Sequence, residues 1–558
     1  MTPLQEWTLE IGGMTCEHCA ETIDRALLRV PDVAESSTNF EHQRSRVMAG
    51  AAVDAGMLQR AVESAGYRVT GFHSGTVVQE TKAATSRSGG PEDGQAADLL
   101  IVGGGSAAFA AAIAAAEMGA TVTMVERATL GGTCVNVGCV PSKTMIRAAE
   151  AVHRAAHGNF AGIRTQAAPV ALNEVVAQKD ELVASLRQTK YRDVLASYPT
   201  VRLVTGGARL TAQGGVTVAG ELIRAGKVIL AAGSRPWAPP IPGLSKTPFL
   251  TSTEALALTE IPRRLIVIGA SAVGIELGQM LSRVGSQVTV LEAMLRIVPA
   301  EDAEIGVALS GHLREEGMTI YTGVTVVGVA GGPGNYRVRI RDTAGEKSLE
   351  AEQLLVATGR RANTAGLGLE DAGILVGTKG EVAANEYLET SRPGVYAAGD
   401  VIGDPMFVYV AAYAGKLAAT NALQGNHHRY DLSALPRVTF TDPAVASVGL
   451  TEAQARERGG GIRVAKLPMS YVPRALAARD TRGLIQLVAN AEGDLLGAHI
   501  LAPEAGEMIE AAAMAIRFHI RVDELANMFH PYLTNAEGLK LAAQAFAKDV
   551  KKLSCCAA

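Results

Sequence analysis

The chain has 558 residues, with 52 Lys and Arg against 56 Asp and Glu, and a formal net charge of −4. This length is too great for one hydrophobic core, so we expect about three to four domains. Basic and acidic residues are interspersed, so no charged tract indicates nucleic acid or an anionic membrane as partner. The longest apolar stretch, residues 107–116, is too short to span a bilayer, and the N-terminus does not read as a signal peptide.

The six cysteines fall in three close pairs, which are Cys16/Cys19, Cys134/Cys139 and Cys555/Cys556. In a large chain without a secretion signal, such pairs indicate metal binding or redox chemistry rather than a framework of structural disulfides. The same reasoning predicts a cytoplasmic location.

Residues 1–71 read as a small module. Its expected elements are a strand at 7–11, a helix at 20–30, a strand at 44–49 and a helix at 55–65. Cys16 and Cys19 follow the first strand, and two thiolates at this spacing can bind one soft ion such as Zn, Cu(I) or Hg(II). The alternative is a thioredoxin-like redox pair, which would need a larger domain. His18 fits a solvated loop residue better than a third ligand.

This module resembles the heavy-metal-associated domain, in its Gly-Met-Thr-Cys-x-x-Cys loop (residues 13–19) and its element order. The resemblance implies a ferredoxin-like βαββαβ fold. Residues 72–96, rich in Ser, Thr, Gly, Gln and Ala, predict a flexible linker.

A first dinucleotide-binding unit follows the linker. An apolar strand at 98–102 leads to Gly103 and Gly105, then to an Ala-rich helix that contains Ala108. Gly103 suits the tight turn, Gly105 lets a pyrophosphate approach, and Ala108 allows close packing of helix and strand. Glu126, at the end of the next strand, suits ribose hydroxyls. A glycine-rich turn without ligand is the alternative, which the combination of strand, helix, second strand and acid disfavours.

Residues 131–143 place Cys134 and Cys139 in a glycine-rich turn that leads into a helical pattern at 142–153. A helix N-terminus stabilises a thiolate, so such a pair can close and reopen a disulfide. Two buried structural thiols are the alternative. The whole string resembles the redox-active disulfide of the flavin disulfide reductases, which include glutathione reductase, dihydrolipoamide dehydrogenase and the mercuric reductases.

The resemblance implies an α/β fold of two Rossmann-like domains and an α+β dimerisation domain, preceded here by the small metal-binding module. It also implies that several residues contact FAD, namely Gly132, Thr133 and Lys143 in the redox string and Ala232 and Gly233 in the turn that closes the first half of the flavin domain. Strands are expected at 201–210, 216–218 and 227–230, and an amphipathic helix at 182–195. Tyr191 in that helix matches an active-site tyrosine of the family; an ordinary buried tyrosine is the alternative.

A second dinucleotide-binding unit carries Gly269, Ser271 and Gly274 between strands at 264–268 and 287–291. Ser271 replaces the middle glycine of the fingerprint; because serine adds little bulk, we expect NAD(P) binding to survive. Two such units imply two dinucleotides, one held tightly and one exchanging. By resemblance, Glu276 pairs with Lys143 beside the flavin ring.

The chain then returns to the flavin domain. A strand at 394–398 runs into Gly399 and Asp400, and by resemblance Asp400 binds the ribityl chain. The predicted domains are therefore 97–255 and 366–435 for FAD, 256–365 for NAD(P), and 436–558 for the interface. The interface domain is expected to have strands at 438–440, 444–448, 462–467, 483–488 and 495–500 and helices at 505–518 and 522–528.

The interface domain of disulfide-reducing relatives carries a histidine base five residues before a glutamate. Here His530 precedes Glu537 by seven residues, and alignment on Glu537 places Tyr532 in the base position. Tyrosine is a poor base at neutral pH, whereas a disulfide substrate needs protons delivered to its leaving thiolate. A metal ion does not need them, so this substitution argues against a disulfide or dithiol substrate.

The C-terminal Cys555 and Cys556 suit capture of a thiophilic ion. Prenylation at Cys555 is a formal alternative. A large thioredoxin reductase also has a redox-active tail, but it would retain the base histidine and lack the metal module. Three thiol pairs, the lost base and the N-terminal module together resemble the mercuric reductases over essentially the whole chain.

The resemblance implies reduction of Hg(II) to Hg(0) by NAD(P)H through FAD, in a homodimer whose active site is shared between subunits. Hg(II) would arrive as thiol complexes. Cys139 would be the thiolate nearest the flavin and Cys134 the outer thiol.

NADPH is expected as donor, although Glu292 after the second-unit strand favours NADH; Arg296 could reach a 2′-phosphate. A dihydrolipoamide or glutathione-type reductase and a non-catalytic metal carrier are the competing hypotheses. The predicted catalytic residues are Cys134, Cys139, Tyr191, Tyr532, Lys143 and Glu276. The predicted mercury ligands are Cys16, Cys19, Cys134, Cys139, Cys555 and Cys556.

Overall fold

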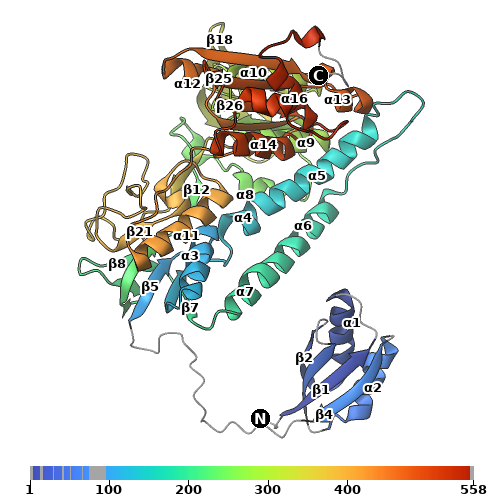
Figure 1. Cartoon of the computed structure of the whole chain (residues 1–558), viewed down its shortest axis with the longest axis vertical. Helices are drawn as coiled ribbons and strands as arrows, with labels where there is room; N and C mark the ends of the chain where they lie inside the picture. The colour runs from blue at the N-terminus through green and yellow to red at the C-terminus, as the bar shows by residue number, and fades with distance from the viewer. Residues whose placement is uncertain are drawn as a thin grey trace. The chain divides into compact units, whose positions relative to one another are not determined.

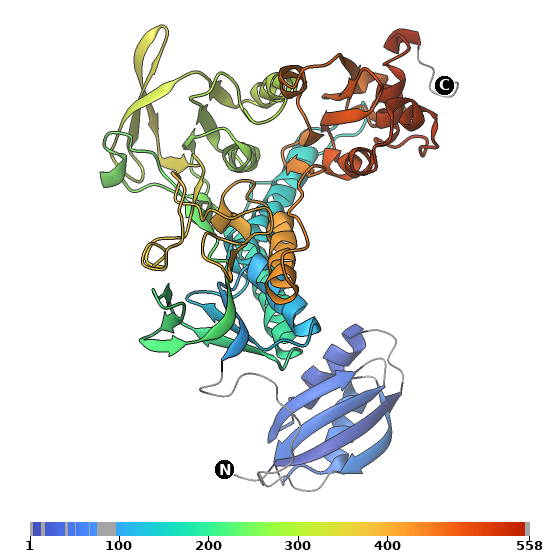
Figure 2. The same cartoon turned by 60° about the vertical axis from the view of Figure 1, so that its left-hand side comes forward.

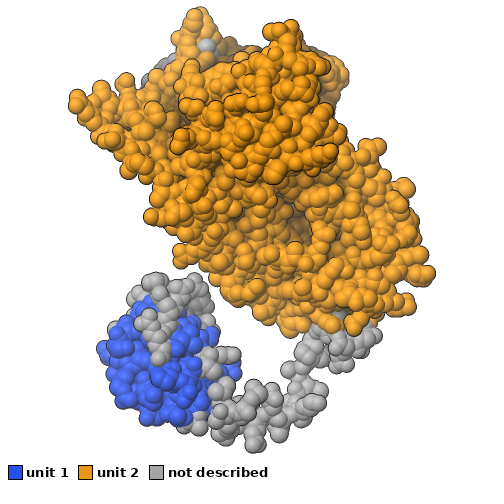
Figure 3. Space-filling model, turned by 180° about the vertical axis from the view of Figure 1, so that it is seen from behind, with its two compact units in different colours: residues 1–87 blue, residues 88–558 orange. Residues whose placement is uncertain are grey.

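The computed structural model describes residues 4–12, 17–28, 30–39, 43–50, 52–65, 67–74 and 96–552. The chain divides into two compact units, residues 1–87 and 88–558, shown in separate colours in Figure 3. Among the described residues, no helix is both long enough and apolar enough to cross a membrane.

The N-terminal unit has the predicted βαββαβ order. Its elements are β1 (Leu4–Gly12), α1 (Glu17–Leu27), β2 (Val33–Asn39), β3 (Arg44–Gly50), α2 (Ala55–Ser64) and β4 (Arg68–Ser74). The antiparallel sheet has the order β2-β3-β1-β4, and its core buries apolar residues from strands and both helices, such as Leu9, Ile23 and Leu58. Cys16 lies outside the described residues, as does the side chain of Cys19, so the predicted metal loop stays a prediction.

The first sheet of the main unit is parallel and is assembled from two distant parts of the chain. Its order is β21 (Val395–Ala397), β11 (Ala225–Leu230), β5 (Ala97–Val102), β6 (Val122–Glu126) and β7 (Val201–Thr205). Helices α3 (Ser106–Glu117) and α11 (Val408–Gln424) lie side by side in both views (Figures 1 and 2). Their closeness requires Gly415, because a Cβ there would lie 2.0 Å from the Ala107 carbonyl oxygen.

The single strand predicted at 201–210 is wrong. The chain forms β7 and then β8 (Ala208–Leu210), which belongs to a separate antiparallel sheet with β9 (Val216–Val218) and β10 (Glu221–Ile223). Gly206, at φ +157°, separates the two strands in a conformation that favours glycine.

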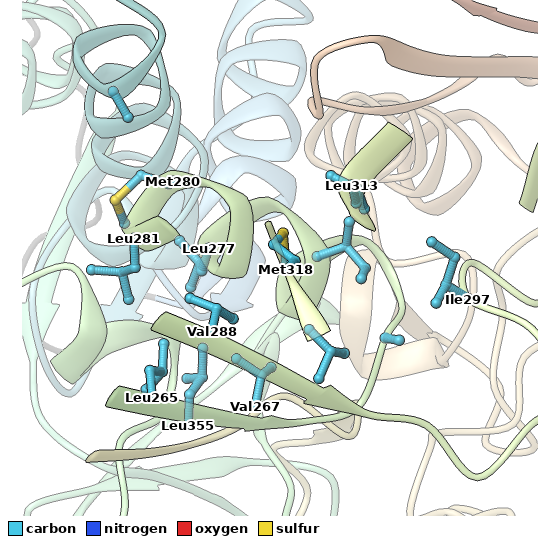
Figure 4. Packing of buried hydrophobic residues seen from close by; sticks show 14 of the residues in the cluster. Leu265, Val267, Leu277, Met280, Leu281, Val288, Ile297, Leu313, Met318 and Leu355 are labelled. Atoms are coloured by element: carbon cyan, nitrogen blue, oxygen red, sulfur yellow. The ribbon is translucent and has the colours of Figure 1, made fainter. Parts of the chain in front are cut away.

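The second parallel sheet has the order β15 (Thr319–Tyr321), β14 (Gln287–Leu291), β13 (Arg264–Ile268) and β19 (Gln353–Val356). Helices α9 (Ala272–Arg283) and α10 (Ala303–Glu315) pack on it. Figure 4 shows this core, in which Val267 and Val288 of the strands meet Leu277 and Leu281 of α9. An antiparallel sheet of β16 (Thr325–Ala330), β17 (Tyr336–Asp342) and β18 (Gly345–Ala351) precedes β19. A short ribbon pairs β12 (Ser234–Pro236) with β20 (Arg360–Ala362).

The C-terminal sheet has the order β22 (Arg437–Thr439), β23 (Ala444–Gly449), β26 (Leu495–Ala502), β25 (Leu484–Asn490) and β24 (Ile462–Pro468). All five strands lie where the sequence predicts them, with ends shifted by one or two residues. The predicted helices are α14 (Ala505–Arg517) and α15 (Val522–Asn527). The sequence analysis left out α12 (Glu452–Glu457), α13 (Pro473–Ala478) and α16 (Glu537–Gln544).

Two long helices connect the first sheet to the rest of the unit. α5 (Cys139–Ala156) and α6 (Leu172–Arg187) run antiparallel (Figure 1), and α6 continues through a π-helical turn at Gln188–Arg192 into α7 (Asp193–Ala196). The single helix predicted at 182–195 is thus three segments. Short helical turns also occur at α8 (Ser252–Ala255), 244–246, 399–402, 469–471 and 550–552.

Candidate active site

The redox string is helical rather than a glycine-rich turn. Cys134 lies in the short helix α4 (Gly132–Val137), and Cys139 is the first residue of α5. Only Gly138 separates the two helices, and a Cβ there would lie 2.9 Å from the Thr133 carbonyl oxygen. This tight junction places both cysteines near helix ends. At the start of α5, unpaired backbone N–H groups stabilise a thiolate on Cys139.

Cys134 and Cys139 are half-buried thiols with no bond between them. The Cys134 thiol donates a hydrogen bond to Cys139, which lowers the pKa of Cys139 to about 7; burial opposes this shift, and the Lys143 charge adds to it. The same hydrogen bond, together with burial, raises the pKa of Cys134. The pKa values of the two thiols are therefore shifted in opposite directions, down for Cys139 and up for Cys134.

Asn136 fixes the backbone of the redox string. Its Nδ2 donates to the carbonyl oxygens of Leu130 at 3.0 Å and Gly132 at 2.8 Å, and its Oδ1 accepts from Arg187 Nε at 2.8 Å. Arg187 ends α6, so this long helix is attached to the site. The sequence analysis missed both residues, since nothing local to Asn136 indicates a partner fifty-one positions away.

The glycines of the first dinucleotide unit lie against the redox string. Gly103 has φ +129°, and a Cβ there would lie 2.2 Å from the Ala231 carbonyl oxygen. Gly105 is the N-cap residue just before α3. A Cβ on Gly132 would lie 2.6 Å from the Gly105 Cα. Ala108 is fully buried. Two helix starts, α3 and α4, thus meet without side chains between them, which is a surface suited to a pyrophosphate.

Glu126 stands beside the same loop. Its carboxylate accepts from the backbone N–H of Ala128 at 2.7 Å, and a Cβ on Gly104 would lie 2.8 Å from it. The side chain is only partly buried, so a ribose hydroxyl can reach the carboxylate.

Asp400 is held by two residues that the sequence analysis did not assign to the site. Ser234 Oγ donates to Asp400 Oδ2 at 2.6 Å, and Arg360 donates to Ser234 through Nε to Oγ at 2.7 Å and through Nη2 to the carbonyl oxygen at 2.8 Å. Burial lowers the pKa of Arg360, against the charges of Asp400 and Cys139. The Gly359-Arg360 pair, which follows β19 in the sequence, was the signal that could have identified Arg360 as a site residue.

The turn of Ala232 and Gly233 is tied to the same region. Asn363 donates from its Nδ2 to the Ala232 carbonyl oxygen at 3.0 Å and from its backbone N–H to the Gly233 carbonyl oxygen at 2.9 Å. Gly233 has φ +69°. Together with Asp400 and the Gly105–Gly132 surface, these groups fit an FAD molecule, because they offer a Cβ-free cradle and a carboxylate that Ser234 holds in place.

Lys143 and Glu276 form an ion pair, with Lys143 Nζ 2.8 Å from Glu276 Oε2. Glu276 lies on α9 and is nearly buried, and its other oxygen accepts from the backbone N–H of Phe440 at 2.8 Å. Lys143 Nζ lies 4.5 Å from the centroid of the Phe440 ring. Three parts of the chain therefore meet one helical turn beyond Cys139.

Tyr191 lies in the π-helical turn, a rare geometry that often occurs at functional sites. Its ring packs edge-on against Phe109 of α3, with centroids 4.7 Å apart. Burial raises the pKa of Tyr191, a hydrogen bond with Ser106 opposes this, and the charges of Cys134 and Cys139 add to it. Tyr191 also lies beside the start of the redox string, because a Cβ on Gly131 would lie 3.6 Å from Tyr191 Cδ1.

Tyr532 and His530 lie in the segment between α15 and α16. Tyr532 is 52% exposed. The His530 ring donates from Nε2 to the Leu525 carbonyl oxygen at 3.1 Å, and buried Glu537 accepts from the Leu533 N–H at 3.2 Å. Glu537 thereby shapes the loop that carries Tyr532. Cys555 and Cys556 lie outside the described residues.

The second dinucleotide unit tolerates its serine. Gly269 has φ +102°, and a Cβ on Gly274 would lie 2.0 Å from the Gly269 carbonyl oxygen. Ser271, by contrast, has φ −81° and ψ −174° as the exposed residue before α9, which any residue adopts. Of the three fingerprint positions, only 269 and 274 need a glycine, and both have one.

Glu292 serves the loop of this unit. Its Oε2 accepts from the Ala270 N–H at 2.7 Å and its Oε1 from the Met294 N–H at 2.9 Å. Both oxygens of this buried carboxylate are therefore engaged by backbone. Nearby, Arg296 donates from Nη2 to the Pro299 carbonyl oxygen at 3.2 Å.

Comparison with known proteins agrees with this geometry. Residues 97–415 match the pyridine nucleotide-disulphide oxidoreductase family, residues 435–543 its dimerisation domain, and residues 8–68 the heavy-metal-associated domain. Mercuric reductase from Staphylococcus aureus is 43% identical over 99% of both chains. That from Streptomyces lividans is 47% identical, over 80% of this chain and 95% of its own length.

Among solved structures, the Cu(II) complex of the HOCl-induced flavoprotein disulfide reductase RclA from Escherichia coli has a TM-score of 0.73 and 28% identity. The match covers 81% of this chain and 99% of that one. The two dinucleotide units, the dithiol at their junction, the dimerisation domain and the full-length relatives agree: the chain belongs to the pyridine nucleotide-disulphide oxidoreductase family and, within it, to the mercuric reductases.

Proposed function

We propose that the chain transfers two electrons from NADPH to Hg(II) held between Cys134 and Cys139, and releases Hg(0). The observation that carries the proposal is the unsymmetrical dithiol at the start of α5. Hg(II) prefers two soft sulfur ligands, and the pair supplies them on adjacent helices. A pKa of about 7 means that about half of Cys139 is thiolate at neutral pH.

The residues around Gly105, Gly132 and Asp400 would hold FAD, which would supply a relay for an electron pair between the nicotinamide and the nearer sulfur. The first electron pair breaks the Cys134–Cys139 bond and leaves two thiols. Hg(II) displaces their protons and forms two S–Hg bonds. A second NADPH would supply the pair that reduces Hg(II), and both S–Hg bonds would break as neutral mercury leaves, with both sulfurs still reduced. The first NADPH is therefore needed only once, to open the disulfide, and each mercury then consumes one NADPH.

The surroundings of the pair support a metal ion as substrate rather than a disulfide. A disulfide substrate needs a base that returns a proton to its leaving thiolate. Tyr532 takes the place of that base, while His530 is engaged with the Leu525 carbonyl oxygen. Tyr191 and Tyr532, the latter from the partner subunit, would then line the path of the metal.

NADPH is supported as the donor by the state of Glu292. An acid in this position selects NADH when its carboxylate is available to the ribose. Here both carboxylate oxygens accept hydrogen bonds from backbone. Arg296, four residues after Glu292, would supply a positive charge for a 2′-phosphate.

The same proposal assigns the outer thiol pairs to delivery of mercury as thiol complexes. Cys16 and Cys19 would collect the ion on the N-terminal unit, and Cys555 and Cys556 would pass it to the redox pair of the other subunit of a homodimer. Free thiols in all three pairs require a reducing compartment, which supports a cytoplasmic location.

Mercury-dependent oxidation of NADPH tests this function. The purified, FAD-loaded chain should oxidise NADPH when a mercury–thiol complex is added, and volatile mercury should leave in a one-to-one ratio. Oxidised glutathione and lipoamide serve as competing substrates. Faster turnover of either one than of the mercury complex would contradict the proposal.

A further inference from the structure

The segment Phe440–Asp442, just after β22, docks along one face of α9. The Phe440 N–H donates to Glu276 Oε1 at 2.8 Å. Asp442 and Gln279 form two hydrogen bonds. The Asp442 N–H donates to Gln279 Oε1 at 2.9 Å, and Gln279 Nε2 donates to the Asp442 carbonyl oxygen at 2.8 Å. Glu276, Gln279 and Arg283 are three and four residues apart, so they share one side of the helix.

Charged groups anchor the far end of this segment. Arg283 Nη1 lies 3.0 Å from Asp442 Oδ2, and Arg482 Nη2 lies 2.9 Å from Asp442 Oδ1. Arg283 is 5% exposed and also pairs with Glu316 at 2.6 Å. Poorly hydrated ion pairs of this kind fix geometry more firmly than exposed ones. The C-terminal domain is thus held in a defined register on α9.

The aromatic ring of the segment faces the catalytic lysine. Lys143 Nζ lies 4.5 Å from the centroid of the Phe440 ring, while the same ammonium is 2.8 Å from Glu276 Oε2. A cation over a ring face is attracted by its quadrupole. One residue therefore contacts both members of the ion pair, the carboxylate through its backbone and the ammonium through its ring.

We propose that Phe440 is a positioning residue through which the C-terminal domain sets the place of the Lys143 charge. Lys143 follows Cys139 by four residues on α5, so the ammonium and the sulfur share a helix face. The inference rests on the proposed function, in which Cys139 exchanges electrons with FAD. Without the ring, Glu276 alone would hold an ammonium that is one-third exposed.

Phe440→Leu tests the ring, because it keeps the backbone N–H and most of the volume. Phe440→Tyr keeps the ring and is the conservative variant. Phe546→Leu is the matched control, since Arg463 lies 5.1 Å from that ring elsewhere in the same domain. The readouts are the rate of flavin bleaching by NADPH without mercury, the long-wavelength thiolate–flavin absorbance of the reduced enzyme, the FAD content and the melting temperature.

Phe440→Leu should slow flavin bleaching at saturating NADPH by about two- to thirtyfold, the range of one lost cation–π contact. It should weaken the long-wavelength band while the KM for NADPH and the FAD content stay unchanged. Phe440→Tyr should restore both readouts, and Phe546→Leu should match the unmodified enzyme. Gln279→Leu, which frees the segment but keeps the ring, should slow bleaching in the same direction by a smaller factor.

Unchanged bleaching and an unchanged band in Phe440→Leu would overturn the inference and leave the proposed function intact. Equal losses in Phe440→Leu, Phe440→Tyr and Phe546→Leu would overturn it as well, because they would show a general effect on the domain. Failure of the proposed function has a different signature, namely a thiolate–flavin band that persists in Cys139→Ala.

Discussion

Gly132 packs directly against Gly105: a Cβ on Gly132 would lie 2.6 Å from the Gly105 Cα, and Gly132 itself has φ +65°. The contact joins the start of the redox string to the glycine just before α3. Residues 27 positions apart in sequence thus form one surface, and Gly132 has no room there for a side chain.

Gly132→Ala should therefore lose FAD. The substitution adds a steric clash to a strained φ, at a cost of about 1–3 kcal/mol, which corresponds to about tenfold or more in affinity. Gly119→Ala is the control, because Gly119 has φ +83° with open space around it. Flavin release on dilution measures the effect; equal FAD retention in the two variants would contradict the cradle.

Cys139 should carry the electron relay and set its pH dependence. Cys139→Ala should abolish the long-wavelength band and mercury reduction while FAD stays bound; full activity would contradict the assignment. Because the pKa of Cys139 is lowered from 9.0 to about 7, the band in the unmodified reduced enzyme should fade as the pH falls through about 7. The stability that this ionisation adds is present above the unfolded-state pKa and is lost over the same descent.

Cys134→Ala should move that titration upward. The hydrogen bond from Cys134 is the largest cause of the lowered pKa of Cys139, so removing the donor should shift the midpoint of the band toward the ordinary value of 9.0. A pH titration of the reduced variant measures the shift. An unchanged midpoint would mean that Lys143 or the helix start dominates.

NADPH should be preferred over NADH in kcat/KM. Arg296→Ala should reduce the preference about ten- to a hundredfold, since one charge-assisted contact to the 2′-phosphate contributes about 1.5–3 kcal/mol. The NADH value of the same variant is the internal control and should change little. A clear preference of the unmodified enzyme for NADH would show that Glu292 binds the ribose after all.

Deletion of residues 1–96 should leave turnover with small thiol–mercury complexes nearly intact. The N-terminal unit forms its own sheet and core, and the redox pair lies wholly in the other unit. Steady-state kinetics of the truncated chain test this, with FAD content as control. A large loss of turnover at full FAD content would indicate a catalytic role for the module.

Cys555 and Cys556 should deliver mercury across the dimer. A Cys555→Ala/Cys556→Ala chain and a Cys139→Ala chain, mixed as subunits, should regain one working site per heterodimer when a bulky dithiol–mercury complex is the substrate. A flexible tail brings its thiols to the pair at high effective concentration. Verified heterodimers without recovered activity would rule out delivery to the other subunit.

Several features of this protein depend only on residues close together in the chain. The strand–glycine–helix units around Gly103 and Gly269 and the redox string at 131–143 are local patterns, because each needs a fixed order of turn, small residue and apolar period. The five C-terminal strands were predictable for the same reason. The helical state of the redox string was not, since its glycines also suit a turn, and Asn136 stabilises α4 through hydrogen bonds to Leu130 and Gly132.

Tertiary structure decided which of these local parts touch. Three sets of contacts join residues up to 166 positions apart. They are the contact of Gly105 with Gly132, the hydrogen bonds from Arg360 through Ser234 to Asp400, and the hydrogen bond from Phe440 to Glu276. Such contacts depend on strand order and helix register, and these are set by how whole faces pack rather than by any short segment. The sequence named the reacting groups, whereas the packing of α3, α4, α5 and α9 fixed their distances and charges.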